Sequence, residues 1–197
     1  MKTRNLALIV ILALVLVLGG CGCSSYNNLI RGDQGVKSSW SNVETNYQRR
    51  TDLYNSVVKT IQGSANFEKS TLNDVISARA RATSIQVNLD NPQSLQQYQQ
   101  AQNQFQGAFG RLLAVAEAYP DLKTTKAFQD FQTQIEGTEN RINIARQDFN
   151  KTVQGYNLQV RTFPNNLFAG VFGFHEKGYF QANPGSENPP DINFNTK

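Results

Sequence analysis

The chain has 197 residues, of which 39% are hydrophobic and 17% charged, and its formal net charge is +4. Removing Lys2 and Arg4 with an export segment would lower that charge from +4 to +2, which argues against a nucleic-acid partner. Cys21 and Cys23 are the only cysteines and His175 the only histidine. The folded part therefore has no disulfide, no cysteine metal site and no histidine-dependent triad, and we expect no cofactor.

The start of the chain has the features of an export signal. Lys2 and Arg4 precede an uninterrupted apolar run from Leu6 to Leu18, which would cover roughly 20 Å as a helix. A bilayer core is about 30 Å thick, so the run is short for a spanning helix and suits a signal peptide over residues 1–20. The run ends in Leu18-Gly19-Gly20-Cys21, which resembles the bacterial lipobox, whose cysteine is diacylated. Cys21 is therefore the predicted lipidation site. The alternative is an uncleaved anchor helix, and in both cases the rest of the chain is exported.

Beyond a short linker at residues 21–26, apolar residues recur at a helical period. One stripe has alternating spacings of four and three: Val36, Trp40, Val43, Tyr47, Arg50, Tyr54, Val57 and Ile61. Similar stripes follow at residues 95–119 and 128–156. This period of about 3.5 residues predicts helices packed side by side, with Trp40 and Phe131 in the core.

Turn signals divide the pattern into four predicted helices, at about residues 27–63, 66–89, 92–118 and 124–162. The dividing residues are Gly63-Ser64, Asp90-Asn91-Pro92 and Tyr119-Pro120-Asp121. Short connections make successive helices antiparallel. The sequence thus predicts an all-α protein, an antiparallel up-and-down four-helix bundle over residues 27–163 behind the N-terminal segment.

The chain after Pro164 is predicted to return to the anchored end of the bundle. Residues 167–174 are the most apolar stretch outside the N-terminal segment. We expect residues 164–180 to form an apolar cap under the bundle, and the alternative is that they lie on the bilayer surface or meet a membrane partner. Residues 181–197 are rich in Asn, Pro and Gly, which is typical of a disordered tail.

Several blocks of sequence resemble the LemA family. Its opening is matched by Val36-Lys37-Ser38-Ser39-Trp40-Ser41-Asn42-Val43 and then Arg49-Arg50-Thr51-Asp52-Leu53. Later blocks, at residues 116–123, 136–142 and 163–174, extend the resemblance over residues 26–180. It implies an N-terminally anchored, mostly up-and-down four-helix bundle, without an established enzymatic activity or ligand. Tyr54-Asn55-Ser56 stands where the family usually carries Ile-Pro-Asn, which puts a kink in the first helix in doubt.

The most informative polar cluster is Arg49, Arg50 and Asp52. Arg50 falls on the apolar stripe of the first helix, where an arginine needs a partner. If the first and last helices are antiparallel, Arg50 lies near Glu139. We interpret these two as a pair that sets the register of the helices, and the alternative is an anion or partner site opening between the same helices.

Two classes of function remain. The first is a non-enzymatic scaffold or adaptor, held in the bacterial cell envelope outside the cytoplasm by a lipid or an anchor helix, with an envelope protein as partner. The second is an envelope hydrolase or transferase that uses carboxylates at an unidentified site. The bundle lacks Cys, His and a glycine-rich phosphate loop, so we predict that the protein is not an enzyme and assign no catalytic or metal residues.

Overall fold

The computed structural model describes residues 2–62 and 68–182, and within them the regular structure is entirely helical. The prediction of an all-α protein is confirmed. The elements are α1 (Lys2–Gln62), α2 (Lys69–Ser84), α3 (Pro92–Ala116), α4 (Pro120–Lys123), α5 (Lys126–Arg161) and α6 (Asn165–Phe172). The predicted disordered tail lies, from residue 183 onward, outside the described residues.

Helix α1 continues far beyond the predicted start at residue 27 and passes through residues 21–26, where a linker was expected. The buried positions Gly22, Ser25 and Leu29 extend the helical stripe of Val36 and Trp40 backwards. Two of these positions carry the small residues Gly22 and Ser25, which do not add to an apolar pattern, so the pattern did not indicate that the helix begins this early. The helix also runs without a break through residues 54–56.

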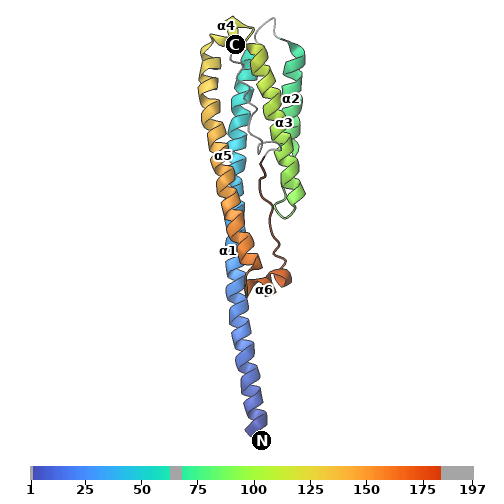
Figure 1. Cartoon of the computed structure of the whole chain (residues 1–197), viewed down its shortest axis with the longest axis vertical. Helices are drawn as coiled ribbons and strands as arrows, with labels where there is room; N and C mark the ends of the chain where they lie inside the picture. Colours follow the sequence, from blue (N-terminus) through green and yellow to red (C-terminus); the bar gives the residue numbers. More distant parts are fainter. Residues whose placement is uncertain (1, 63–67, 183–197) are drawn as a thin grey trace, which may run out of the picture.

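The long helices associate in two pairs. Helix α5 descends beside α1, and α3 lies beside α2, as Figure 1 shows. Side-chain caps explain where α3 and α5 start. Asn91, which precedes Pro92, accepts a hydrogen bond from the Gln93 amide, and Thr125 accepts one from the Phe128 amide. The helix borders near residues 92 and 124 were therefore predicted well.

Helix α2 ends at Ser84, five residues before its predicted end near residue 89. Ile85 has extended dihedrals (φ −82°, ψ 118°), and residues 85–88 have no helical structure. Ile85, Val87 and Leu89 are half-buried against the core, whereas the residues between them are exposed. This alternation is the period of an extended chain, and the prediction misread it as the end of a helix.

The core consists of two apolar clusters. The distal cluster, far from the N-terminus, is centred on Tyr54, Phe109 and Phe131, and Tyr54 stacks on Phe109 at 3.5 Å between ring centroids. The proximal cluster surrounds Trp40 and Phe149. Trp40 is 6% exposed and Phe131 3%, so both are core residues as predicted.

The chain after α5 forms a short helix and then an extended segment. Helix α6 packs against α1 and α5, as a cap would, but only Ala169 among its residues is buried. Gly173 adopts a left-handed conformation (φ 74°) and ends α6. Residues 174–182, which we call the strap, then run back along the helices (Figure 1). The strap contributes Phe180 to the core, whereas the prediction placed all of residues 164–180 in an apolar cap under the bundle.

Candidate functional site: a buried polar layer and a C-terminal strap

A polar layer separates the two apolar clusters, and Arg50 is its centre. Arg50 is 1% exposed. Its guanidinium donates to the side-chain oxygen of Gln102 (Nη2–Oε1, 2.6 Å) and pairs with Glu139 (Nη1–Oε1, 3.4 Å). Gln102 in turn donates to the Ala82 carbonyl (3.4 Å). Because these residues belong to α1, α2, α3 and α5, the layer connects all four long helices.

The structure brings Arg50 and Glu139 together, but the rest of the predicted cluster lies apart. Arg49 and Asp52 are exposed, and Asp52 accepts a hydrogen bond from Gln48 (2.9 Å). The shorter contact of Arg50 is with Gln102, which sequence reasoning did not assign as a partner. Its position on the apolar stripe of α3 was the available signal, because a polar residue there needs a buried partner.

The surroundings of Arg50 are aromatic and closed to solvent. Its guanidinium carbon lies 4.8 Å from the centroid of the Tyr47 ring. Burial raises the pKa of Tyr47, Tyr54 and Tyr98 above the ordinary 10.0, so these phenols stay neutral at physiological pH. The two terminal nitrogens of Arg50 are paired within the chain, whereas its Nε is buried without a hydrogen-bond partner. A guanidinium paired across helices in this way can fix their register.

A second buried cation, Lys177, holds the strap in place. Its side chain is 1% exposed, and its ammonium contacts Asp33 of α1 (2.8 Å) and Asp90 of the α2–α3 connection (2.7 Å). Burial alone would lower the pKa of Lys177, but the hydrogen bonds to both carboxylates outweigh it and raise that pKa. Burial alone would raise the pKa of Asp33, yet its bonds to Lys177 and Lys37 lower it. The charges therefore stabilise each other in the folded chain.

Three side-chain amides bind the backbone of the strap as a neighbouring β-strand would. Asn157 donates to the Lys177 carbonyl and accepts from the Lys177 amide, both at 2.9 Å. Asn150 does the same with Phe180 (3.0 and 2.9 Å), and Gln99 with Gln181 (2.6 and 3.3 Å). Each pair satisfies one N–H and one C=O of a segment that has no strand beside it.

The strap also completes the proximal cluster. Phe180 is 5% exposed and stacks on Trp40, with 6.0 Å between ring centroids and 21° between ring planes. Gly178 passes the N-terminus of α3 so closely that a Cβ atom there would lie 3.2 Å from Cα of Pro92. Lys177 and the amides were not predicted as functional residues, because only folding brings them and their partners together.

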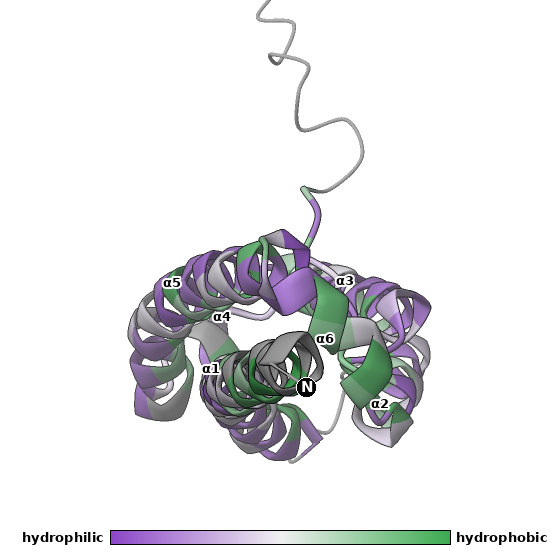
Figure 2. Cartoon of the chain, turned by 90° about the horizontal axis from the view of Figure 1, so that it is seen from below, coloured by the Kyte–Doolittle hydropathy of each residue, from purple (hydrophilic) through white to green (hydrophobic). Residues whose placement is uncertain are grey.

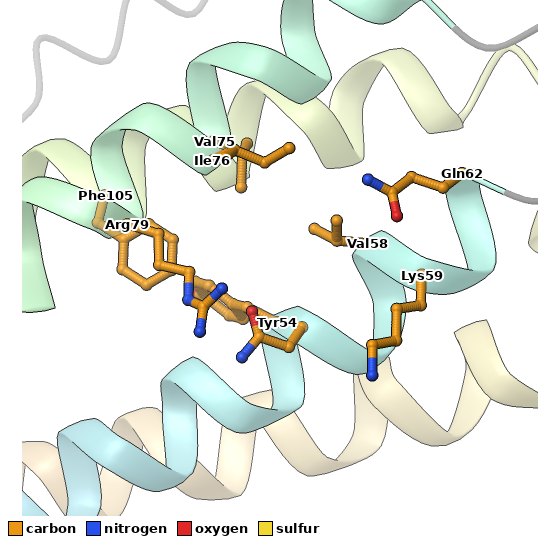
Figure 3. Close-up of a pocket in the computed structure, with 9 residues that line it drawn as sticks. Tyr54, Val58, Lys59, Gln62, Val75, Ile76, Arg79 and Phe105 are labelled. Carbon is orange, nitrogen blue, oxygen red and sulfur yellow. The ribbon is translucent and has the colours of Figure 1, made fainter.

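A pocket of about 420 Å³ opens between α1, α2 and α3 at the distal end. Figure 3 shows Arg79 near Phe105 at one end, Lys59 and Gln62 at the other, and Val58 between them. Cations beside apolar surface suit a ligand or partner that carries an acidic group next to apolar groups. This is the chemistry that the distal end offers.

The other end of the molecule is markedly apolar. Cys21 and Cys23 are exposed there, and His175 is exposed just beyond α6. Among the residues that the structure describes, no group of three or more His, Cys, Asp or Glu is placed to hold a metal ion. Over the same residues, no helix contains a stretch both long and apolar enough to cross a membrane.

The sequence is similar to those of known bacterial proteins. The chain is similar to magnetosome protein MamQ 2 of Paramagnetospirillum magneticum, at 26% identity over 183 residues that cover 83% of this chain and 67% of the relative. It is also similar to protein LemA of Metamycoplasma hominis, at 26% identity over 156 residues, or 79% and 68% of the two chains. The family model described as LemA family matches residues 39–194, which is most of the sequence. The chain therefore belongs to the LemA family.

Proposed function

We propose that this LemA-family protein is a non-enzymatic scaffold or adaptor of the cell envelope. In this proposal the N-terminal segment attaches it to a membrane through a lipid on Cys21 or through an anchor helix. The four long helices form an up-and-down bundle that stands outside the cytoplasm and presents its surface to an envelope protein.

The observation that carries the anchoring is the gathering of exposed apolar side chains at the N-terminal end. On α1 these are Leu8, Ile9, Ile11, Leu12 and Leu16, each 59–68% exposed. On and beside α6 they are Phe163, Leu167, Val171 and Phe172. Apolar surface of this extent in water is unfavourable, and it is typical of a surface that meets lipid or another protein.

The scaffold role is supported by the way the protein uses its buried charges. Arg50 and Lys177 are neutralised by groups of the same chain, and each connects segments that are far apart in the sequence. Ion pairs whose cation is buried, as here, can set the positions of the helices and segments that they connect. A single uninterrupted α1 then joins the apolar N-terminal segment to this bundle.

Acyl labelling tests the attachment. Cells fed an acyl-chain analogue should label the wild-type chain but not Cys21→Ser, and Cys23→Ser is the matched control that should still be labelled. Equal labelling of wild type and Cys21→Ser would contradict a lipid on Cys21, and an intact Met1 on the mature protein would show that the segment was not cleaved.

Mild crosslinking of membranes, followed by mass spectrometry, tests the scaffold role. Wild type should yield the same few envelope proteins, crosslinked to defined residues of the bundle, in repeated preparations. The control is Cys21→Ser protein that has been displaced from the membrane. If wild type yields only proteins that this control also yields, the scaffold role is wrong.

A further inference from the structure

Helix α6 is an uncharged apolar helix that the bundle leaves largely uncovered. Leu167 is 61% exposed, Val171 79% and Phe172 42%, and Phe163 just before the helix is 78% exposed. Only Ala169 is buried. Figure 2 shows α6 as a hydrophobic element facing the viewer when the molecule is seen from its N-terminal end. Burying this surface would remove an unfavourable contact with water.

Side-chain contacts fix the height of α6 along α1. A Cβ on Gly22 would lie 3.3 Å from the Phe168 ring, so α6 crosses α1 one residue after Cys21. Tyr26 packs edge-on against Phe172 at 5.0 Å and Phe174 at 6.0 Å between ring centroids. At about 1.5 Å per residue, Gly22 and Tyr26 lie roughly 1.5 and 7.5 Å above Cys21.

These heights coincide with the interfacial layer of a bilayer. The layer outside the hydrocarbon core is about 5–7 Å thick on each side. If a lipid on Cys21 holds the chain, α6 crosses α1 within that layer. If the apolar run is instead an uncleaved anchor ending at Leu18, Gly22 lies roughly 6 Å and Tyr26 roughly 12 Å above the end of the run, so only the crossing at Gly22 falls within the layer.

We propose that α6 lies on the membrane itself, with the side chains of Leu167 and Val171 inserted at the boundary between headgroups and acyl chains. This inference rests on the membrane attachment proposed above and adds a second contact to it. The bilayer is the occupant that fits, because the anchoring segment brings it to the level of α6 and because α6 carries no charge. The exposed ion pair of Arg161 and Glu176 (2.7 Å) supplies polar groups close to the ends of α6.

A second contact changes what the anchor does. If a lipid on Cys21 were the only contact, the bundle could change its tilt relative to the membrane freely. With α6 also on the surface, the bundle would stand at a fixed angle, because α6 packs against both α1 and α5 and the strap continues from its end. The distal pocket would then be held at a constant distance from the membrane.

Tryptophan quenching in vesicles tests this placement. The purified full chain, with Val171→Trp, is reconstituted into phosphatidylcholine vesicles whose acyl chains are brominated close to the glycerol. Val171 is 79% exposed, so the substitution should leave the fold intact. The control is Ile76→Trp on α2, at an exposed position that lines the distal pocket. The emission of wild type comes from the buried Trp40, and it is subtracted from the emission of each variant.

We expect the emission added by Val171→Trp to lie at shorter wavelength with vesicles than without them. It should also be about twofold weaker in brominated than in unbrominated vesicles, because a face at this boundary lies about 5–10 Å into the interface. The emission added by Ile76→Trp should not change. If the protein floats with the vesicles but the two variants are quenched equally, α6 faces something other than lipid and this inference is wrong. If the protein does not float with the vesicles, the proposed attachment is wrong, and this inference with it.

Discussion

Replacing Lys177 with methionine keeps most of the side-chain volume but removes the charge that holds the strap. Breaking a fully buried pair typically costs about 3–5 kcal/mol, because the remaining charge is left uncompensated. Here Asp33 keeps its contact with Lys37 (2.8 Å), and the Asp90 side chain is 64% exposed, so water screens it. We therefore expect a loss of about 2 kcal/mol in the free energy of unfolding at neutral pH, below the range for a fully buried pair.

The pH dependence of this loss has a definite sign. The folded pKa of Asp33 is lowered from 3.8, so its contribution is present above that pH and disappears as the pH falls through the folded value. The folded pKa of Lys177 is raised from 10.5, so its contribution is present below that pH and disappears as the pH rises through the folded value. The difference between wild type and Lys177→Met should be constant in between and shrink at both extremes.

Urea unfolding of the full chain in detergent measures the effect with two probes. Circular dichroism reports the helices, and Trp40, the only tryptophan, reports the strap because it stacks on Phe180. Lys177→Met should shift the fluorescence midpoint at least as far as the dichroism midpoint. Lys151→Met, at an exposed position of α5, is the control and should change neither. The reasoning is refuted if both lysine variants unfold at the wild-type midpoint.

Three further sets of variants test other parts of the structure. Arg50→Met or Glu139→Leu alone should lower the free energy of unfolding by about 3 kcal/mol, whereas the double variant should lose much less; simple additivity would mean that the two do not interact. Gly173→Ala should lower the free energy of unfolding by about 1–2 kcal/mol because φ is positive there. The control, Gly170→Ala, lies inside α6 with open space around it and should lower it by nothing; equal midpoints of the two variants in thermal unfolding would contradict this. Asn157→Ala should speed hydrogen exchange of the strap amides, and unchanged exchange would show that the strap is held without that side chain.

Helical periodicity predicted most of the long helices, because residues that share a face of one helix can be identified from spacing alone. The spacing also led to the pairing of Arg50 with Glu139, since an antiparallel arrangement of the first and last helices, with its register estimated from the apolar stripes, brings these two residues near each other. Periodicity failed where small residues carry the packing. Gly22 and Ser25 are buried on α1, yet neither contributes to an apolar pattern.

The strap could not be predicted in the same way. An extended segment has no partner within its own sequence, and the amides that bind it come from two helices. Gln99 and Gln102 lie in a glutamine-rich stretch that composition alone assigns to a solvent-exposed face, yet both are buried. Gln102 stands on the apolar stripe of α3, which marks it as buried, but only the tertiary structure distinguishes Gln99 from the exposed glutamines around it, because its amide group meets the strap.

Attachment to a membrane outside the cytoplasm is tested most directly by locating the full chain in the cell. Membranes from cells that express the untagged protein are washed with alkaline carbonate, and intact spheroplasts are treated with a protease that does not enter them. A membrane-attached protein that stands outside the cytoplasm should stay with the washed membranes and be digested by the added protease. Recovery in the carbonate wash, or complete protection in intact spheroplasts, would contradict a membrane-attached protein that stands outside the cytoplasm.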